Sequence, residues 1–324
     1  MKDQAAPPTF SLIVPAYNEG RAVAQVLRDL RGVLDRLPVS SEIVVVDDGS
    51  ADDTAAQVEG AAVAGVRLVR NPINLGYGHS LLRGIAAAHG TLLGITDADG
   101  TYPPTAIPAL FEMYSRGADH AIGQRTGRHY QRFWSPRHVY RLLCRYVVGQ
   151  YVPDANSGLR LFRREVVETL RGDLCLGFSF TTSLTLASIM SGYVVTFTPI
   201  EYHKRIGRSH VRFRDVLRTM QYLFQLVAVY NPLKLFLPLV VAAALLAVGS
   251  FSYGVWLERI AGMVSGVIMT AATLLLVGIA GHSCSQSRIG LYPLALHRPR
   301  PNDGARETAT AVAAHVPVAS EAGP

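Results

Sequence analysis

The sequence predicts an α/β domain with a mostly parallel sheet, followed by a two-helix hairpin that crosses a membrane. Two patterns in the 324 residues carry this prediction. Over residues 10–125, β-branched runs of strand length alternate with segments of helical periodicity, as in consecutive βαβ units. Farther along, residues 235–257 and 260–281 contain no charged side chain. Each of these runs exceeds the roughly 20 apolar residues that span a bilayer.

The first four predicted strands lie at residues 10–18, 42–50, 66–71 and 92–99. Between the first two, apolar residues recur every three or four positions over residues 23–37, which predicts a helix with one face on the sheet. Ser50, with Asp53 three residues later, predicts the N-cap of the next helix. Parallel sheets bind ligands outside the carboxyl ends of their strands, so we expect the loops after these strands to form one site.

The chain before the two uncharged runs has an amphipathic pattern. Apolar side chains recur at helical spacing over residues 213–227, with arginines off the stripe, which predicts an interfacial helix on an anionic membrane. An ordinary helix packed against the α/β domain is the alternative. The predicted organisation is a cytoplasmic domain at 1–210, an amphipathic juxtamembrane helix at 211–234, a transmembrane hairpin at 235–282 and a disordered cytoplasmic tail at 283–324.

Charges around the hairpin indicate its orientation. Glu258 and Arg259 are the only residues between the two uncharged runs, whereas basic residues flank them on both outer sides. By the positive-inside rule, both termini and the α/β domain face the cytoplasm. Burial of the two runs as core helices of a soluble domain is the alternative, which their length and lack of charge disfavour.

The composition and the motifs that are missing limit the classes of partner and function that this chain can have. A formal charge of +7 suggests an anionic partner. The three cysteines match no paired metal or redox spacing, and the polar N-terminus predicts no secretory signal. The chain has no G-x-x-x-x-G-K-[ST] loop, and Leu81 replaces the third glycine of a dinucleotide fingerprint. An ATPase and a dinucleotide-dependent reductase are therefore disfavoured.

Two carboxylates one residue apart follow the fourth predicted strand. Asp97 and Asp99 each raise the cost of ionising the other. A hard divalent cation would offset this repulsion, since Mg²⁺ takes one or two protein carboxylates and completes its octahedron with substrate phosphates and water. An ordinary turn is the alternative, because Asp-Gly pairs are common in turns. The position after a strand favours the cation site.

Six segments of the chain share a wider resemblance. They are VPAYNE (14–19), VVDDGS (45–50), NPINLGYGHSLLRG (71–84), DADGTYPP (97–104), DANSGLRLFRR (154–164) and PIEYHKRIGRSH (199–210). In this order they resemble the motifs of family 2 glycosyltransferases, most closely the polyprenyl-phosphate group that includes dolichol-phosphate mannose synthase. The resemblance covers residues 10–238 and implies a GT-A type nucleotide-sugar-binding domain. The C-terminal hairpin agrees with the bacterial branch of that group.

The resemblance implies a donor site built from two loops. Pro15, Tyr17 and Glu19 in the first loop, with Asp47 and Asp48 after the second strand, would hold the nucleoside of the sugar donor. All five lie at the end of a predicted strand or directly after it, where ligands bind to parallel sheets.

The resemblance also implies a metal site. Asp97 and Asp99 correspond to the motif that meets the donor ribose or diphosphate and a divalent cation, Mg²⁺ or Mn²⁺. Mannose synthases tend to have Leu-Gln after this motif, with the glutamine supporting the metal. Gly100 and Thr101 stand there in this chain, so Thr101 is the third candidate metal ligand, and metal preference and donor sugar stay open.

Basic residues correspond to the acceptor site. Arg125 completes a G-x-R segment with Gly123, and Arg205 with Ser209 match the segment thought to meet the acceptor phosphate. Arginine suits this task because its planar fork bonds two oxygens at once. Reserve phosphate ligands are Lys204 and Arg160.

Asp154 corresponds to an acidic residue near the reacting centre, sometimes proposed as a base. A polyprenyl phosphate is already anionic at neutral pH, so this nucleophile needs positioning more than proton removal. The expected catalytic residues are Asp154, Asp99, Arg125 and Arg205.

The resemblance and the site chemistry predict a metal-dependent hexosyltransferase of the cell envelope. It would move a sugar from a nucleotide-sugar to a polyprenyl phosphate, of dolichyl or undecaprenyl type, at the cytoplasmic membrane face, with inversion at the anomeric carbon. One alternative is a membrane glycosyltransferase with a polysaccharide or another lipid acceptor, and another is a catalytically silent membrane-bound scaffold. The expected partners are donor, acceptor and membrane lipid, without nucleic acid. A homo-oligomer is left open.

Overall fold

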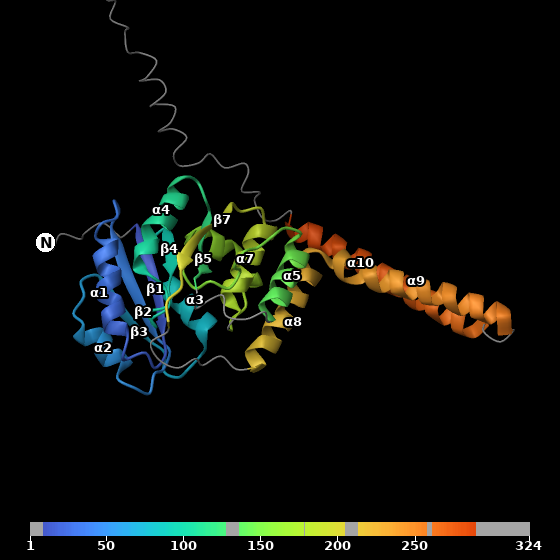
Figure 1. Ribbon diagram of the computed structural model, residues 1–324, viewed down its shortest axis with the longest axis horizontal. Coiled ribbons are helices and arrows are strands. Elements are labelled where there is room, and N and C mark those ends of the chain that lie inside the picture. Colours follow the sequence, from blue (N-terminus) through green and yellow to red (C-terminus); the bar gives the residue numbers. More distant parts are fainter. Residues whose placement is uncertain (1–8, 128–135, 178, 205–212, 258–260, 290–324) are drawn as a thin grey trace, which may run out of the picture.

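The computed structural model describes residues 9–127, 136–177, 179–204, 213–257 and 261–289. In this part of the chain, seven strands form one sheet in the order β3-β2-β1-β4-β6-β5-β7, and helices cover both of its faces (Figure 1). The last two helices leave this α/β domain as a long hairpin (Figure 1). The predicted α/β class with a mostly parallel sheet is confirmed.

The first four strands pair in parallel. They are β1 (Phe10–Ala16), β2 (Ser41–Asp47), β3 (Val66–Arg70) and β4 (Leu92–Ile95). β1 lies between β2 and β4, and all 7 of its residues are buried. A strand covered on both faces has no solvent side, which explains why its sequence is nearly continuously apolar.

The second half of the sheet contains the strand that runs against the others. Its strands are β5 (His120–Thr126), β6 (Arg160–Arg163) and β7 (Val195–Glu201). β5 and β7 are parallel, whereas β6 is antiparallel to both β4 and β5. The amino end of β6 therefore lies at the same edge of the sheet as the carboxyl ends of its neighbours.

Helices pack on the two faces of the sheet in two apolar clusters. Because side chains alternate along a strand, Leu12 and Val14 enter one cluster and Ile13 the other. The first cluster includes α1 (Val23–Leu34), α2 (Thr54–Gly60) and α4 (Ile107–Ser115), which follows the 3-10 turn η1 (Pro104–Ala106). The second includes α3 (Tyr77–Ala87), α5 (Pro136–Val148), α6 (Arg164–Leu170), α7 (Phe180–Met190) and α8 (Phe213–Tyr230), with the 3-10 turn η2 (Arg171–Asp173) after α6.

The predicted N-cap at Ser50 is wrong. α2 begins at Thr54 after Asp53, and Ser50 Oγ instead accepts a hydrogen bond from the Asn18 N–H at 2.9 Å. Asn18 has a φ of 56°, a conformation that Asn adopts more readily than most residues. The spacing of polar residues predicts a cap, but it does not show whether the hydroxyl bonds to its own helix or to a neighbouring loop.

The C-terminal half of the apolar stripe on α8 packs against the α/β domain. Leu223, Leu226 and Val227 are buried in the same cluster as α5 and α7, and the Tyr230 hydroxyl donates to Asp173 Oδ2 at 2.8 Å. For these side chains, the alternative prediction is therefore the one observed: an ordinary helix packed against the α/β domain. Phe224, by contrast, is 58 % exposed.

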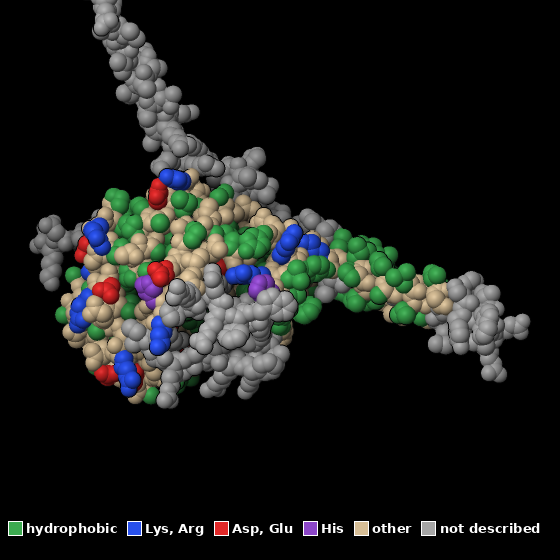
Figure 2. All heavy atoms as spheres, viewed as in Figure 1, with side chains coloured by type: hydrophobic (Ala, Val, Ile, Leu, Met, Phe, Trp, Pro, Cys, Tyr) green, Lys and Arg blue, Asp and Glu red, His purple; other side chains and the backbone are tan. Residues whose placement is uncertain are grey.

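α9 (Pro232–Leu257) and α10 (Ala261–Ile289) lie side by side in the region predicted as a transmembrane hairpin (Figure 1). They approach closely at Gly278, where an added Cβ would lie 3.0 Å from Phe236 Cβ. Hydrophobic side chains cover much of the hairpin surface (Figure 2), and Leu245 is 68 % exposed. Within the described part of the chain, no helix combines the length and the apolar character that a membrane crossing requires.

α10 continues to Ile289, beyond the predicted end of the hairpin at residue 282, so the first residues of the predicted disordered tail are helical. Residues 282–289 include neither Gly nor Pro, and nothing in their backbone stops a helix. The rest of the predicted tail, residues 290–324, lies outside the described residues.

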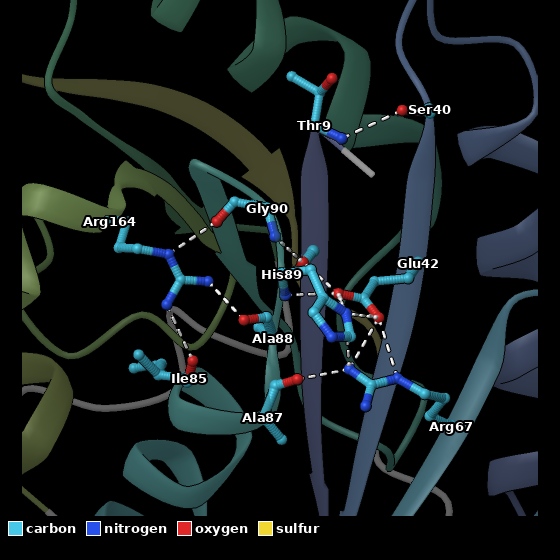
Figure 3. A network of polar contacts seen from close by, with 11 residues as sticks. Thr9, Ser40, Glu42, Arg67, Ile85, Ala87, Ala88, His89, Gly90 and Arg164 are labelled. Atoms are coloured by element: carbon cyan, nitrogen blue, oxygen red, sulfur yellow. Dashed lines mark hydrogen bonds and ion pairs between the residues drawn. The ribbon is translucent and has the colours of Figure 1, made fainter. Parts of the chain in front are cut away.

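A buried carboxylate ties the strands together at the edge where they begin (Figure 3). Glu42 on β2 accepts hydrogen bonds from Ser11 Oγ and His89 N, both at 2.7 Å, and pairs with Arg67 on β3 at 2.9 Å. Burial raises the pKa of Glu42, but these hydrogen bonds hold the pKa below its ordinary value. Arg164 donates to three carbonyl oxygens at and after the end of α3 (Figure 3). This network stabilises the edge of the sheet opposite the candidate site.

Candidate functional site

The candidate residues gather where β1, β2, β4 and β5 end and β6 begins. The polar side chains come from the last residues of these strands, from the loops that follow them and from the segment before β6. The described candidates are Pro15, Tyr17, Glu19, Asp47, Asp48, Asp97, Asp99, Thr101, Arg125 and Asp154. Arg205 and Ser209 lie outside the described residues, so their place in the site stays a prediction.

The first two loops are tied to each other. Besides the bond from Asn18 to Ser50, the Ala51 N–H donates to Asn18 Oδ1 at 2.9 Å, and the Glu19 N–H donates to Thr54 Oγ1 at 2.9 Å. Tyr17 and Glu19 therefore stand on a loop with a fixed shape. Pro15 differs from them, because it is buried within β1 opposite Val46.

The acidic pair after β2 is engaged by the chain itself. Asp47 Oδ1 accepts the Ser50 N–H at 3.0 Å. Asp48 accepts three hydrogen bonds, from Asn71 Nδ2 at 2.7 Å, Leu75 N at 2.9 Å and Gly76 N at 2.8 Å. Asp48 thus organises the loop between β3 and α3, a task that the sequence motif does not reveal.

The acidic pair after β4 is held by hydroxyl groups. The Tyr77 hydroxyl donates to Asp97 Oδ1 at 3.0 Å. Asp99 is buried, and its Oδ1 accepts the Thr101 N–H at 3.0 Å and the Thr101 hydroxyl at 2.7 Å. Thr101 is fully buried, so the contact shown for this candidate metal ligand is support of Asp99.

The donor set suits a hard cation that is shared with a substrate. Among the residues that the structure describes, no group of three or more His, Cys, Asp or Glu side chains is placed to hold a metal. Asp97 and Asp99 could therefore supply two carboxylates at most, and the remaining ligands would have to come from a phosphate-bearing substrate and water. Mg²⁺ is commonly bound in this way, by one or two protein carboxylates together with substrate phosphates and water.

Three tyrosines that the sequence prediction missed surround the pair. Tyr77 contacts Asp97, the Tyr102 hydroxyl accepts the Gly158 N–H at 2.6 Å, and the ring of Tyr202 packs edge-on against Tyr102 at 5.3 Å between centroids. Burial raises the pKa of each hydroxyl, so all three stay protonated near neutral pH. Their only signal in the sequence is their position within or beside the motifs.

Arg125 and Asp154 are paired with each other. Arg125 Nε donates to Asp154 Oδ2 and Nη2 to Oδ1, both at 2.8 Å, and the Arg125 N–H adds a bond to Oδ2 at 3.1 Å. The Asp154 side chain is 2 % exposed, and the guanidinium lies 5.5 Å from the centroid of the Tyr202 ring. This bidentate arrangement fixes the plane of the arginine fork.

Arg160 is a structural residue, so its prediction as a reserve phosphate ligand is wrong. Its side chain is fully buried and donates to Ser157 O at 3.0 Å, Thr181 O at 2.8 Å and Thr185 Oγ1 at 3.0 Å. Burial lowers the pKa of Arg160 to about 10, which leaves the guanidinium charged at neutral pH. The antiparallel β6 places this side chain beneath the site, and the motif alone does not predict that depth. Lys204, the other reserve, is exposed.

α5 carries an exposed apolar stripe that the sequence analysis did not single out. Val139, Leu142 and Tyr146 share one face of this helix and are 58 %, 65 % and 46 % exposed. An open pocket of about 580 Å³ lies beside Leu142 and Tyr146, lined also by Arg145 and Lys234. Lys234 Nζ donates to carbonyl oxygens in the last turn of α5 at 3.1 and 3.2 Å, which joins the start of the hairpin to this helix.

Comparison with known proteins shows which family model and which enzymes this chain resembles. Residues 11–171 match the model of glycosyl transferase family 2. The low-salt glycan biosynthesis hexosyltransferase Agl6 of Haloferax volcanii is 28 % identical over 230 residues, which are 68 % of this chain and 54 % of Agl6. The undecaprenyl-phosphate 4-deoxy-4-formamido-L-arabinose transferase of Pseudomonas fluorescens is 28 % identical over 258 residues, 78 % of this chain and 73 % of that enzyme. The Sodalis glossinidius enzyme of that name is 32 % identical over 166 residues, 49 % of this chain and 50 % of the enzyme. The chain thus spans about half the length of Agl6 and of the Sodalis enzyme.

Two crystal structures of glucosyl-3-phosphoglycerate synthase from Mycobacterium tuberculosis share the fold. The complex with phosphoglyceric acid has a TM-score of 0.54 at 22 % identity, over 68 % of this chain and 80 % of the synthase. The complex with Mn²⁺, uridine diphosphate and glucosyl-3-phosphoglycerate has a TM-score of 0.51 at 22 % identity, over 68 % and 78 %. The likeness shows that the α/β domain has a GT-A type fold.

Proposed function

We propose that this chain, whose residues 11–171 match the model of glycosyl transferase family 2, moves a sugar from a nucleotide-sugar to a polyprenyl phosphate with inversion at the anomeric carbon. The observation that carries the proposal is a single sheet edge. Thr101, which holds Asp99 in the acidic pair, accepts the His203 N–H at 2.9 Å, and the ring of the preceding residue, Tyr202, lies 5.5 Å from the Arg125 guanidinium. An acidic pair for the donor and a fixed arginine for the acceptor are what such a transfer requires. The names of the relatives agree, since two are undecaprenyl-phosphate sugar transferases and one is a hexosyltransferase.

The proposed donor site combines the first loops with the second acidic pair. Asp97 and Asp99 would hold Mg²⁺ or Mn²⁺ against the donor diphosphate, and Thr101 keeps the Asp99 carboxylate in place. When bound, this cation would supply Lewis-acid stabilisation of the charge that moves onto the departing diphosphate. The synthase of the same fold that was solved with Mn²⁺ and uridine diphosphate is consistent with this assignment.

The proposed acceptor site depends on a preoriented arginine. Asp154 fixes the fork of Arg125 before any acceptor arrives, and a fixed fork loses less freedom when it binds a phosphate. The acceptor phosphate is already ionised, so its attack needs no proton acceptor. We therefore propose that Asp154 is a positioning residue and not a base. Arg205 and Ser209 would complete the phosphate site.

An acceptor panel tests this function. Membranes that contain the protein receive labelled nucleotide-sugars with polyprenyl phosphate, with the unphosphorylated polyprenol, or with neither. We expect solvent-extractable labelled lipid only with the phosphate, and only for one or a few donors, because the alcohol offers no ionised nucleophile. Equal labelling of the alcohol would contradict a phosphate nucleophile. Label that appears only in polymer would support a polysaccharide acceptor, and no label from any donor would support a silent scaffold.

We also propose that the hairpin holds the catalytic domain at the cytoplasmic face of a membrane and spans the bilayer. The exposed apolar side chains of α9 and α10, and the apolar stripe on α5 beside the start of the hairpin, support contact with lipid. The flanking basic residues support a cytoplasmic location for both termini. A lipid acceptor would then present its phosphate to the site while its tail stays in the bilayer.

Cysteine labelling tests this topology. In a background without the native cysteines, Glu258→Cys between the helices is expected to react with an impermeant reagent added from the far side of the membrane. Ser320→Cys in the tail is the matched control and should react only after the membrane is opened. A hairpin that lies on the cytoplasmic surface would instead leave both positions unlabelled until opening, and the reverse pattern would show the opposite orientation.

A further inference from the structure

Tyr77 joins the loop before α3 to the acidic pair after β4. Its hydroxyl donates to Asp97 Oδ1 at 3.0 Å, across 20 residues of sequence. We infer that Tyr77 is a positioning residue that fixes the Asp97 carboxylate for the divalent cation of the donor complex. This inference rests on the proposed function and adds a determinant of metal affinity that lies outside the acidic motif.

The loop before Tyr77 is anchored by Asp48. This carboxylate accepts the N–H groups of Leu75 and Gly76 at 2.9 and 2.8 Å, so the two residues before Tyr77 are fixed to the end of β2. Asn71, at the start of the loop, also donates to Asp48, and its own Oδ1 accepts Arg83 Nη1 at 2.6 Å. Through this loop, Asp48 fixes the position of Tyr77, which in turn contacts Asp97.

The first turn of α3 has little room to shift. A Cβ added to Gly78 would lie 2.5 Å from the carbonyl carbon and oxygen of Leu176, so the helix backbone is pressed against another backbone segment. Gly76 precedes the helix with a φ of 96°, which favours glycine. The close contact at Gly78 and the conformation of Gly76 therefore restrict the position of the backbone of Tyr77, which lies between them.

Asp97 is confined from a second direction. A Cβ added to Gly158 would lie 2.8 Å from Asp97 Oδ2, so the backbone before β6 is close to this oxygen while Tyr77 bonds to the other one, Oδ1. Asp97 is only partly buried, and repulsion from Asp99 would otherwise favour rotation toward solvent. A neutral hydroxyl fixes the carboxylate without reducing its charge, whereas a lysine or arginine there would compete with the cation.

Tyr77→Phe tests the inference, because it removes the hydroxyl and keeps the ring. Mn²⁺ is titrated into wild-type and variant full-length protein with uridine diphosphate or guanosine diphosphate, and unbound Mn²⁺ is measured by electron paramagnetic resonance. We expect Tyr77→Phe to weaken Mn²⁺ binding about tenfold, at the lower end of the roughly 10- to 100-fold loss seen when a partner of a metal ligand is removed. Nucleoside diphosphate binding without metal should not change, which a general loss of structure would not produce.

Tyr230→Phe is the matched control. It removes a tyrosine hydroxyl that donates to a carboxylate, Asp173, at 2.8 Å but lies away from the site. Its Mn²⁺ affinity should equal that of the wild type, and the melting temperatures of the two variants should be similar. Equal Mn²⁺ binding by Tyr77→Phe and wild type would overturn the inference alone. Absence of Mn²⁺ binding by the wild type with either diphosphate would overturn the metal-dependent function together with the inference.

Discussion

Replacing Asp99 with asparagine is expected to lower the rate of sugar transfer by about 10²- to 10³-fold. Asparagine keeps the size of the side chain but removes the negative charge that would hold the cation of the donor. The carboxylate is buried, and its Oδ1 accepts two hydrogen bonds from Thr101 that an asparagine oxygen can also accept, so the change removes mainly the charge. The measurement is the initial rate of lipid labelling at saturating donor and acceptor.

Asp35→Asn is the control for the loss of a negative charge. Asp35 is an exposed carboxylate that pairs with Arg31 on α1, far in the sequence from the acidic pair, and its replacement should leave the rate unchanged. Excess chelator should lower the wild-type rate to the level of Asp99→Asn. Full turnover in chelator, or a wild-type rate for Asp99→Asn, would exclude a metal held by this residue.

The sheet and its first helix could be predicted because buried strands and helices have recognisable local patterns of apolar residues. β1 and β2 are covered on both faces and read as apolar runs, and α1 shows its buried side every three or four residues. β6 left no such signal, because it has only 4 residues and lies between β4 and β5. Its antiparallel direction, which buries Arg160, is set by tertiary pairing.

Amphipathic periodicity also did not show what covers an apolar face. The stripe on α8 reads equally well as a membrane-facing or a domain-facing surface, and the structure packs Leu223 and Leu226 into the core. α5 has the same kind of periodicity but keeps Leu142 exposed. The two helices differ in their neighbours, which a helix sequence does not encode.

The motifs named the residue types of the site but not their partners. Asp97 and Tyr77 lie 20 residues apart, and Arg125 and Asp154 lie 29 apart. Such contacts depend on where two loops meet above the sheet. The sequence alone therefore left Asp154 open as a base, and only the geometry pairs it with Arg125.

The second large effect is expected at the Arg125–Asp154 pair. Asp154→Asn and Arg125→Met should each lower the rate of transfer by about 10²-fold, since a small misplacement of a positioning group costs that much. Each change also leaves the charge of the remaining partner uncompensated. Because the Asp154 side chain is only 2 % exposed, this loss destabilises the fold by about 3 kcal/mol or more. Asp119→Asn is the matched control, because it breaks the pair with Arg163 at the opposite edge of the sheet. It should lower the melting temperature without a comparable loss of turnover.

The double variant separates positioning from base catalysis. If Asp154 acts only through Arg125, then Asp154→Asn combined with Arg125→Met loses no more activity than the worse single variant, because each change already destroys the same arrangement. A base would act independently of the arginine, and the two losses would multiply to about 10⁴-fold. Removing a base would also abolish the limb of the pH–rate profile that reports its deprotonation. We expect losses that do not multiply and a profile of unchanged shape, because the acceptor phosphate brings its own negative charge. Multiplied losses together with a missing limb would establish Asp154 as the base and contradict the positioning role.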